Sequence, residues 1–223
     1  MHKELCEERK RNMIIIGVTG NTGAGKSTVS TIIKNNTGAL VIDADQIVKE
    51  LMVPGEEYFN SVVSLFGEEI LKTKPAKHKG KIDTGKLAVE MFNNDEKREK
   101  LNKLTFKYVG KKTKELILEN KDKEVIVLDF PLLYEGGFEK ICNCVIGVVA
   151  DEETKIKRIK ERDKINRDQI LARLNVQMNE EKLKESVTYV VKNSGETRYI
   201  NLVKDVVKLV HKIKKDEEEK KNS

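Results

Sequence analysis

The stretch GVTGNTGAGKSTVS, Gly17 to Ser30, is the strongest indication of the fold of this chain. It contains the pattern GxxxxGK(S/T), filled by Gly20, Gly25, Lys26 and Ser27. The apolar run MIIIGVT precedes the loop and the helix-periodic run STVSTIIKN follows it, which is the strand, loop and helix context of a P-loop. Glycines let the backbone turn its N–H groups toward phosphate oxygens, and the helix N-terminus adds partial positive charge. The stretch therefore predicts a site for a nucleoside triphosphate.

Two side chains of this loop have specific expected roles. Lys26 reaches the β and γ phosphates, and the hydroxyl of Ser27 ligates Mg²⁺. The nucleotide-binding set expected from the loop is Gly20, Asn21, Thr22, Gly23, Ala24, Gly25, Lys26, Ser27 and Thr28.

Size and composition indicate one globular domain. The chain has 223 residues, of which 38% are hydrophobic and 36% charged. We expect a charged extension over residues 1–12, a single P-loop domain over 13–214 and a charged flexible tail over 215–223.

The net charge of +6 is concentrated in one place. The segment KTKPAKHKGKIDTGK, Lys72 to Lys86, has six lysines against one aspartate. No aromatic residue is interleaved with these lysines, as single-stranded nucleic acid would require, so a solvated loop is favoured and no nucleic-acid partner is expected.

Cysteine usage and hydropathy bear on location. Cys6, Cys142 and Cys144 form neither an even framework nor a CxxC pair, and the latter two are expected on one face of a strand. The N-terminus lacks the apolar region of a secretory signal, and no apolar run is long enough for a membrane span. A reducing, cytoplasmic location without membrane partners is expected, with an organellar address left open.

Short apolar runs alternate with helical patterns along the chain, which is typical of a three-layer α/β fold around a parallel sheet. Five strands are expected at Met13 to Thr19, Ala39 to Asp43, Glu124 to Asp129, Val145 to Ala150 and Val187 to Lys192. Helices are expected at Lys26 to Asn35, Gln46 to Met52, Glu56 to Phe66, Thr84 to Phe92, Asp95 to Leu104, Lys107 to Asn120, Glu152 to Arg162, Asp168 to Val176 and Thr197 to Lys214. About 80 residues separate the second and third strands, so a helical insertion is predicted at about 55–120.

The second predicted strand ends in VIDAD, which places Asp43 and Asp45 at the same sheet edge as the P-loop. Asp43 is a candidate for the metal side of the site. Asp45 can accept a hydrogen bond from an attacking hydroxyl and orient it. Alternatively, Asp45 caps the helix QIVKEL, and spacing alone does not choose between these roles.

The third predicted strand ends in Asp129, in a weak match to a Walker B segment. The PLLYEGGF segment after it has the rigidity and apolar character of a ligand-pocket wall, or of ordinary core.

The segment DEETKIKRIKERD places Arg158 and Arg162 four residues apart on one helix face. A helix of this kind can close as a lid, about residues 151–185, and neutralise charge on a transferring phosphoryl group. Ion pairs with Glu153 or Glu161 are the alternative.

The fifth predicted strand ends in a turn at Asn193, Ser194 and Gly195. Its backbone either contacts an adenine edge or simply leads into the next helix.

Two classes of nucleotide hydrolase fit poorly. The nearest segment to the guanine-reading NKxD motif is Asn120 to Lys123, which has its aspartate one position early and precedes a strand. Phe130 follows Asp129 where a motor or AAA-type ATPase has a glutamate.

Seven segments of the chain, in this order, resemble those of the dephospho-coenzyme A kinases. They are GVTGNTGAGKST, VIDADQIVKELMVPGEEY, MFNNDEKREKLNKLT, LDFPLLYEGGF, RIKERD, ILARLNVQM and VVKNSGE. The resemblance spans about Met13 to Leu209. It implies ATP-dependent phosphorylation of the 3′-hydroxyl of the ribose of dephospho-CoA, the last step of coenzyme A synthesis.

The resemblance also implies residue roles. Asp45 becomes the general base or orienter for the ribose hydroxyl, Lys26 and Ser27 hold ATP and Mg²⁺, and Arg158 is the lid arginine, with Arg162 on the same helix. The insertion forms the CoA-side lobe, PLLYE lines the acceptor pocket, and Asn193 to Gly195 lie near adenine.

The chain departs from the family pattern at several positions. The family loop usually reads GGIGSGKST, so Asn21, Thr22 and Ala24 differ, although none removes a phosphate-binding group. Lys49 stands for an arginine and Thr105-Phe106 for a His-Pro pair. The alternatives are another small-molecule kinase, for a nucleoside or nucleotide, and a nucleotide-dependent nucleic-acid-binding protein. The oligomeric state is left open.

Overall fold

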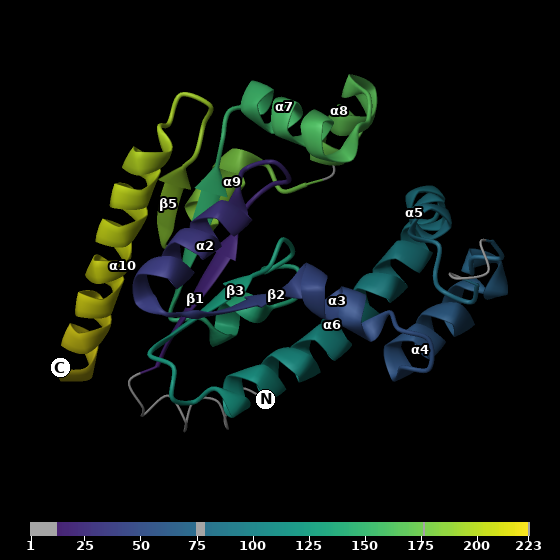
Figure 1. Ribbon diagram of the computed structural model, residues 1–223, viewed down its shortest axis with the longest axis horizontal. Helices are drawn as coiled ribbons and strands as arrows, with labels where there is room; N and C mark the ends of the chain where they lie inside the picture. Colours follow the sequence, from purple (N-terminus) through teal and green to yellow (C-terminus); the bar gives the residue numbers. More distant parts are fainter. Residues whose placement is uncertain (1–12, 75–78, 176, 223) are drawn as a thin grey trace. The chain divides into compact units, whose positions relative to one another are not determined.

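The computed structural model describes residues 13–74, 79–175 and 177–222. The chain forms two compact units: a sheet unit, made of the residues up to Asp43 and from Asn120 onward, and a helical unit, Ala44–Glu119 (Figure 1). The expected N-terminal extension, Cys6 and four residues of the lysine-rich segment lie outside the described residues.

The sheet unit contains the five parallel strands predicted from the sequence. They are β1 (Ile14–Thr19), β2 (Leu40–Asp43), β3 (Val125–Asp129), β4 (Cys144–Val149) and β5 (Tyr189–Lys192). Their order is β2-β3-β1-β4-β5, so β1 lies at the centre between β3 and β4. The loop after β1 therefore leaves the middle of the carboxyl edge, where the strand order reverses and open α/β sheets bind ligands.

Successive side chains of a strand point to opposite faces of the sheet, and both faces of this sheet are covered. Ile14, Ile16 and Val18 of β1 pack in one core with helices α2 (Lys26–Thr37) and α10 (Tyr199–Asn222). Gly17 points the other way, where a Cβ would meet Leu133 and Cys142. That second face carries the short helix η3 (Phe138–Ile141) and the chain around α9 (Glu180–Ser186), which confirms the three layers.

Two further helices follow β4 in the sheet unit. They are α7 (Glu152–Asp163) and α8 (Arg167–Asn175), and they pack on each other through Ile156, Ile159 and Ile170.

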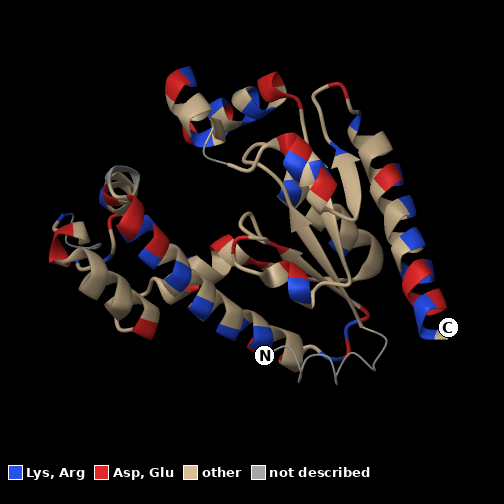
Figure 2. Cartoon of the chain, turned by 180° about the vertical axis from the view of Figure 1, so that it is seen from behind, with Lys and Arg blue, Asp and Glu red and all other residues tan. Residues whose placement is uncertain are grey.

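The helical unit has its own core. It consists of α3 (Ala44–Leu51), α4 (Glu57–Phe66), η1 (Glu68–Ile70), α5 (Thr84–Asn93) and α6 (Asp95–Glu119). Tyr58, Val62 and Phe66 of α4 are fully or nearly fully buried in this core. Charged residues follow α6 along much of its length (Figure 2), which leaves a narrow apolar stripe to pack against α4.

Two helices, α6 and α9, differ from what the sequence predicted. A single helix, α6, replaces those expected at Asp95 to Leu104 and Lys107 to Asn120. At the expected break, the hydroxyl of Thr105 donates to the carbonyl of Leu101 and also meets the Tyr58 hydroxyl at 2.8 Å. The helix α9 was not predicted, because seven residues give too short a pattern to recognise.

The last helix, α10, continues to Asn222, beyond the expected end at Lys214. Its final turns are tied to the sheet, because Tyr189 donates to Asp216 at 2.9 Å and Asn143 donates to Glu217 at 2.7 Å. Charge alone predicted fraying there, but these tertiary contacts hold the helix.

The two described cysteines occupy different settings. Cys144 begins β4 and is buried, which raises its pKa to about 12, whereas Cys142 precedes the strand and is half-buried. The expectation that both lie on one strand face was therefore wrong for Cys142. Among the helices that the structure describes, none is both long and apolar enough to cross a membrane.

Candidate functional site

The P-loop, Gly20–Ser27, joins β1 to α2 and is packed tightly against its neighbours. Gly25 precedes α2 with φ of 92°, and a Cβ there would overlap Nδ2 of Asn193. Gly20 has φ of 150°, and a Cβ there would overlap the carbonyl oxygen of Val148 on β4. Both glycines are required by the backbone conformation and by the neighbouring atoms.

The start of α2 has the polarity that an anion requires. Lys26 bends back across the loop, and its Nζ donates to the carbonyl of Gly20 at 2.8 Å. Ser27 and Thr28 are exposed in the first turn. Within α2, whose residues are all described, that turn has no acidic side chain, so the positive end of the helix is not neutralised there.

Two carboxylates end neighbouring strands beside this loop. Asp43 of β2 and Asp129 of β3 are paired in register. Asp129 is only 5% exposed, and burial raises the pKa of its carboxyl above the ordinary 3.8, against the opposing effect of the Lys26 ammonium. The weak Walker B match undervalued Asp129, because the structure places its carboxylate within the electrostatic reach of both Lys26 and Asp43.

Asp45 belongs to the helical unit, two residues after the end of β2. It is exposed and stands in the first turn of α3, which begins at Ala44. Asp45 therefore lies inside the helix and does not precede it as a capping residue does, so the capping alternative loses support.

Arg158 of α7 makes the densest set of hydrogen bonds at the P-loop. Its Nη1 donates to the carbonyls of Gly23 at 3.1 Å, Ala24 at 3.2 Å and Asn193 at 2.9 Å, and its Nη2 donates to Oδ1 of Asn193 at 3.3 Å. One guanidinium thus joins α7, the P-loop and the turn after β5. The ion pairs with Glu153 or Glu161 that the sequence also allowed are replaced by these contacts with the loop.

Asn193 completes this junction from the other side. Its side chain is 5% exposed, and its Nδ2 donates to the carbonyl of Ala24 at 3.0 Å. The amide supports the P-loop through this carbonyl and does not occupy a loop N–H group.

The turn after β5 is also fixed to the start of α7. Asp151 accepts from the backbone N–H of Thr154 at 2.8 Å and from its hydroxyl at 2.7 Å. The same hydroxyl accepts from the N–H of Gly195 at 2.8 Å. The hydrogen bonds from Thr154 hold the pKa of Asp151 well below its usual range. The backbone of Gly195 is thereby anchored at a defined position beside the loop.

Arg162 lies one turn beyond Arg158 but has different contacts. It is largely exposed and pairs with Asp163 at 2.7 Å, and Asp163 also pairs with Arg173 of α8 at 2.7 Å. The structure therefore does not bring the two predicted arginines to the same partners.

Sequence reasoning missed the contacts of the segment after α8. The side chain of Gln177 faces Thr22, and the carbonyl of Met178 accepts from Nδ2 of Asn21 at 3.1 Å. The motif ILARLNVQM contains both residues, but its pattern does not indicate a contact with residues more than 150 positions earlier in the chain.

The segment PLLYE after β3 is divided between core and surface. Leu133 is fully buried and Leu132 is 38% exposed. The hydroxyl of Tyr134 donates to the carbonyl of Ser186 at 2.5 Å, which ties this segment to the end of α9.

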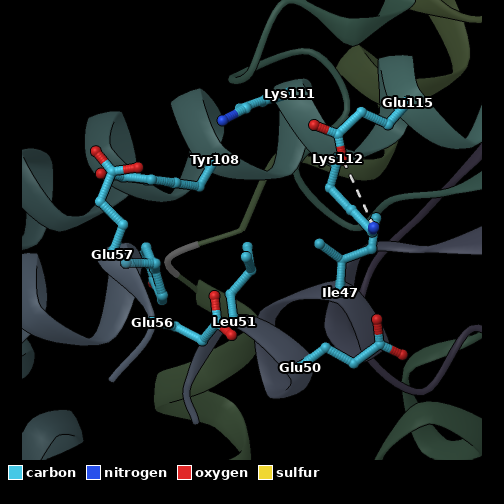
Figure 3. A pocket seen from close by; sticks show the side chains of 10 residues that line it. Ile47, Glu50, Leu51, Glu56, Glu57, Tyr108, Lys111, Lys112 and Glu115 are labelled. Atoms are coloured by element: carbon cyan, nitrogen blue, oxygen red, sulfur yellow. Dashed lines mark ion pairs between the residues drawn. The ribbon is translucent and has the colours of Figure 1, made fainter. Parts of the chain in front are cut away.

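The helical unit contains a pocket of about 290 Å³ (Figure 3). Its apolar part includes Ile47, Leu51 and Tyr58, and its charged rim includes Lys111 and Lys112, with Lys112 paired to Glu115 at 3.5 Å. Because α-helical residues are about 100° apart, Asp45 lies on a different face of α3 from Ile47 and Leu51 and does not face this pocket.

The donor set at the sheet edge fits Mg²⁺. Among the described residues, no group of three or more His, Cys, Asp or Glu side chains is arranged to hold a metal by itself. Mg²⁺ is usually held by one or two protein oxygens together with phosphates and waters. The exposed hydroxyl of Ser27, with the carboxylates of Asp43 and Asp129 nearby, supplies oxygen ligands of that kind.

Comparison with known proteins is consistent across sequence and structure. The family model described as dephospho-CoA kinase matches residues 14–198. Dephospho-CoA kinase from Fusobacterium nucleatum is 39% identical over 185 residues, covering 82% of this chain and 92% of that protein. The enzyme of that name from Listeria monocytogenes is 35% identical, covering 80% of this chain and 88% of its own length.

Solved structures agree. The structure of TT1252 from Thermus thermophilus has a TM-score of 0.75 and 28% identity, covering 90% of this chain and 97% of its own. Dephospho-CoA kinase from Campylobacter jejuni has a TM-score of 0.62 and 28% identity, covering 91% of this chain and 98% of its own.

Proposed function

This chain belongs to the dephospho-CoA kinase family, and we propose on that premise that it transfers the γ-phosphoryl group of ATP to the 3′-hydroxyl of the ribose of dephospho-CoA. The observation that carries the proposal is the extent of the family match. Residues 14–198 include the P-loop, the whole helical unit, α7 and the turn after β5.

The reaction forms a bond between the ribose oxygen and the γ-phosphorus and breaks the bond from that phosphorus to the β,γ-bridging oxygen. ADP takes the electron pair of the broken bond. The hydroxyl proton passes to Asp45 or to solvent; because the transition state of phosphoryl transfer is largely dissociative, orientation of the hydroxyl by Asp45 matters more than early deprotonation.

The remaining roles follow from charge and position. Lys26 neutralises charge on the β and γ phosphates, while N–H groups at the end of the loop and the start of α2 hold the phosphate chain. Ser27 and Asp43, with Asp129 behind them, would hold Mg²⁺, which when bound shields the charge of the triphosphate.

Arg158 and Arg162 are proposed to act from the nucleotide side. Arg158 supports the P-loop through the carbonyls of Gly23 and Ala24, so its charge lies beside the phosphates. Arg162 is exposed one turn further along α7, and we propose that its guanidinium exchanges the carboxylate of Asp163 for a phosphate when the nucleotide binds. The anchored turn at Asn193 to Gly195 is the proposed neighbour of adenine.

The experiment is a coupled ADP-release assay across an acceptor panel containing dephospho-CoA, nucleosides, nucleoside monophosphates and buffer alone. Strong turnover with dephospho-CoA is expected. Equal turnover with nucleoside monophosphates and none with dephospho-CoA would contradict the proposal and favour another small-molecule kinase.

A second arm tests the lysine-rich segment. Deleting Lys72 to Lys81 should leave turnover largely intact, because the flanking residues Leu71 and Ile82 are paired in a β-bridge and the shortened chain can be rejoined there. Loss of turnover together with loss of nucleic-acid binding would favour the nucleic-acid alternative.

A further inference from the structure

The tip of the P-loop is joined to the segment after α8 by three hydrogen bonds. The backbone N–H of Thr22 donates to Oε1 of Gln177 at 2.9 Å, and Nε2 of Gln177 donates to the Thr22 hydroxyl at 2.9 Å. Nδ2 of Asn21 donates to the carbonyl of Met178 at 3.1 Å. Thr22 and Gln177 are both half-buried, so the paired amide and hydroxyl are partly shielded from water.

The direction of these bonds is fixed by chemistry. A backbone N–H only donates, so the amide oxygen of Gln177 must face Thr22 N, and its NH₂ group must face the hydroxyl. The hydroxyl of Thr22 accepts from that NH₂ group and retains its own hydrogen for donation. A hydroxyl that accepts a hydrogen bond is polarised into a stronger donor.

Thr22 lies on the side of the loop that meets the terminal phosphate. Lys26, the side chain expected at the β and γ phosphates, has its Nζ 2.8 Å from the carbonyl of Gly20 at the loop's beginning. The other end of the loop, Gly25, leads into α2, whose N-terminus faces the inner phosphates. A hydroxyl at position 22 is therefore expected nearer to the γ-phosphate than to the α-phosphate.

Both loop residues in this contact depart from the family pattern, which has glycine and isoleucine at these positions. Neither of those side chains has a polar atom, so the hydroxyl and the carboxamide are features of this chain.

We propose that Thr22 donates its hydroxyl hydrogen to the γ-phosphate and that Gln177 is a positioning residue which orients this hydroxyl. The contact between Asn21 and Met178 holds the two segments together. The inference rests on the proposed function, because it requires ATP in the P-loop.

The test measures nucleotide binding directly, without acceptor, by calorimetry with a non-hydrolysable ATP analogue and with ADP. Thr22→Val keeps the volume and the backbone N–H bond but removes the hydroxyl. Gln177→Ala removes the positioning amide. Each variant is expected to bind the triphosphate analogue about 10-fold more weakly, the effect of losing a hydrogen bond to a charged group, with unchanged affinity for ADP.

Two further variants separate positioning from general damage. The double variant, Thr22→Val with Gln177→Ala, should bind the analogue no more weakly than whichever single variant binds it less tightly, because both changes remove the same hydrogen bond from Thr22 to the γ-phosphate. Gln177→Glu keeps the acceptor for Thr22 N–H, but its carboxylate draws the Thr22 hydrogen toward itself, so analogue binding should fall at least as far as in Gln177→Ala. Glu185→Ala, on the exposed surface of α9, is the matched control and should bind both nucleotides as the unmodified chain does.

Several results would overturn the proposal: equal losses for ADP and the analogue, fully additive losses, or tighter analogue binding by Gln177→Ala, which would mean that Gln177 competes with the phosphate. If Gln177→Ala does not fold, Thr22→Val with unchanged analogue binding is sufficient to refute it. Absence of nucleotide binding by the unmodified chain would instead contradict the proposed function.

Discussion

Replacing Arg158 by alanine is expected to destabilise the sheet unit as well as to slow catalysis. Arg158 supplies four hydrogen bonds to Gly23, Ala24 and Asn193, and Asn193 is only 5% exposed. Hydrogen bonds from a charged donor contribute about 1.5–3 kcal/mol, and the bonds here share one guanidinium, so we expect a loss of about 2–3 kcal/mol in the free energy of unfolding. For a chain of this size, that corresponds to a fall of about 5–10 °C in Tm.

The assay is thermal and urea unfolding of Arg158→Ala, Arg158→Lys and Arg162→Ala, alongside kcat with ATP. Arg158→Lys should recover only part of the loss, because an ammonium lacks the planar fork that spans several carbonyls. Arg162→Ala is the matched control for stability, since its exposed ion pair with Asp163 contributes no more than about 1 kcal/mol.

An Arg158 that acts only on the transferring phosphoryl group gives a different result. In that case Arg158→Ala should lower kcat but leave Tm within about 1 °C of that of the unmodified chain, since no structural contact would be lost. That outcome would show that the Arg158 guanidinium does not hold the P-loop and the Asn193 turn together.

Three further predictions follow from other parts of the site. Asp45→Asn should lower kcat by roughly 10²-fold with nearly unchanged ATP affinity in titrations, as is typical of lost acid-base assistance; normal turnover would leave Asp45 without a catalytic role. Asp129→Asn should raise Tm at neutral pH while reducing turnover, because burial raises the folded-state pKa of the Asp129 carboxyl, so that its ionisation as pH rises reduces the stability of the unmodified chain. The difference in Tm should shrink as pH falls toward 3.8, where the carboxyl is protonated in the folded protein. A difference in Tm that does not depend on pH would contradict this cause. Gly25→Ala should abolish ATP binding in calorimetry, because the new methyl group overlaps Nδ2 of Asn193 at a φ of 92°; retained binding would show that Asn193 moves away at little cost.

Local patterns predicted the parts of the fold that depend on local physics. The apolar runs predicted all five strands to within a few residues. The runs of β1, β3 and β4 are continuous because these strands are buried along their whole length, whereas β2 and β5, at the two edges of the sheet, are only partly buried. The P-loop could be recognised because its glycines, lysine and serine follow one another in the chain. Helix ends were harder: α10 extends past Lys214 only because Asp216 and Glu217 meet Tyr189 and Asn143.

The candidate site was less predictable where it depends on distant partners. Arg158 was identified from its helical spacing, but its acceptors, Gly23 and Ala24, lie more than 130 residues earlier in the chain. Asp129 was undervalued because an aspartate after an apolar run is common, and only the strand register places it beside Asp43. Gln177 had no visible signal, because its partner is defined by packing alone.

The proposed reaction transfers a phosphoryl group to dephospho-CoA and keeps it from water. The most direct measurement is mass spectrometry of the reaction products after incubation with ATP, Mg²⁺ and dephospho-CoA, with ADP measured in the same sample. We expect one phosphorylated acceptor, coenzyme A, for each ADP formed. ADP formation with dephospho-CoA left unmodified would contradict it and would identify the chain as a hydrolase.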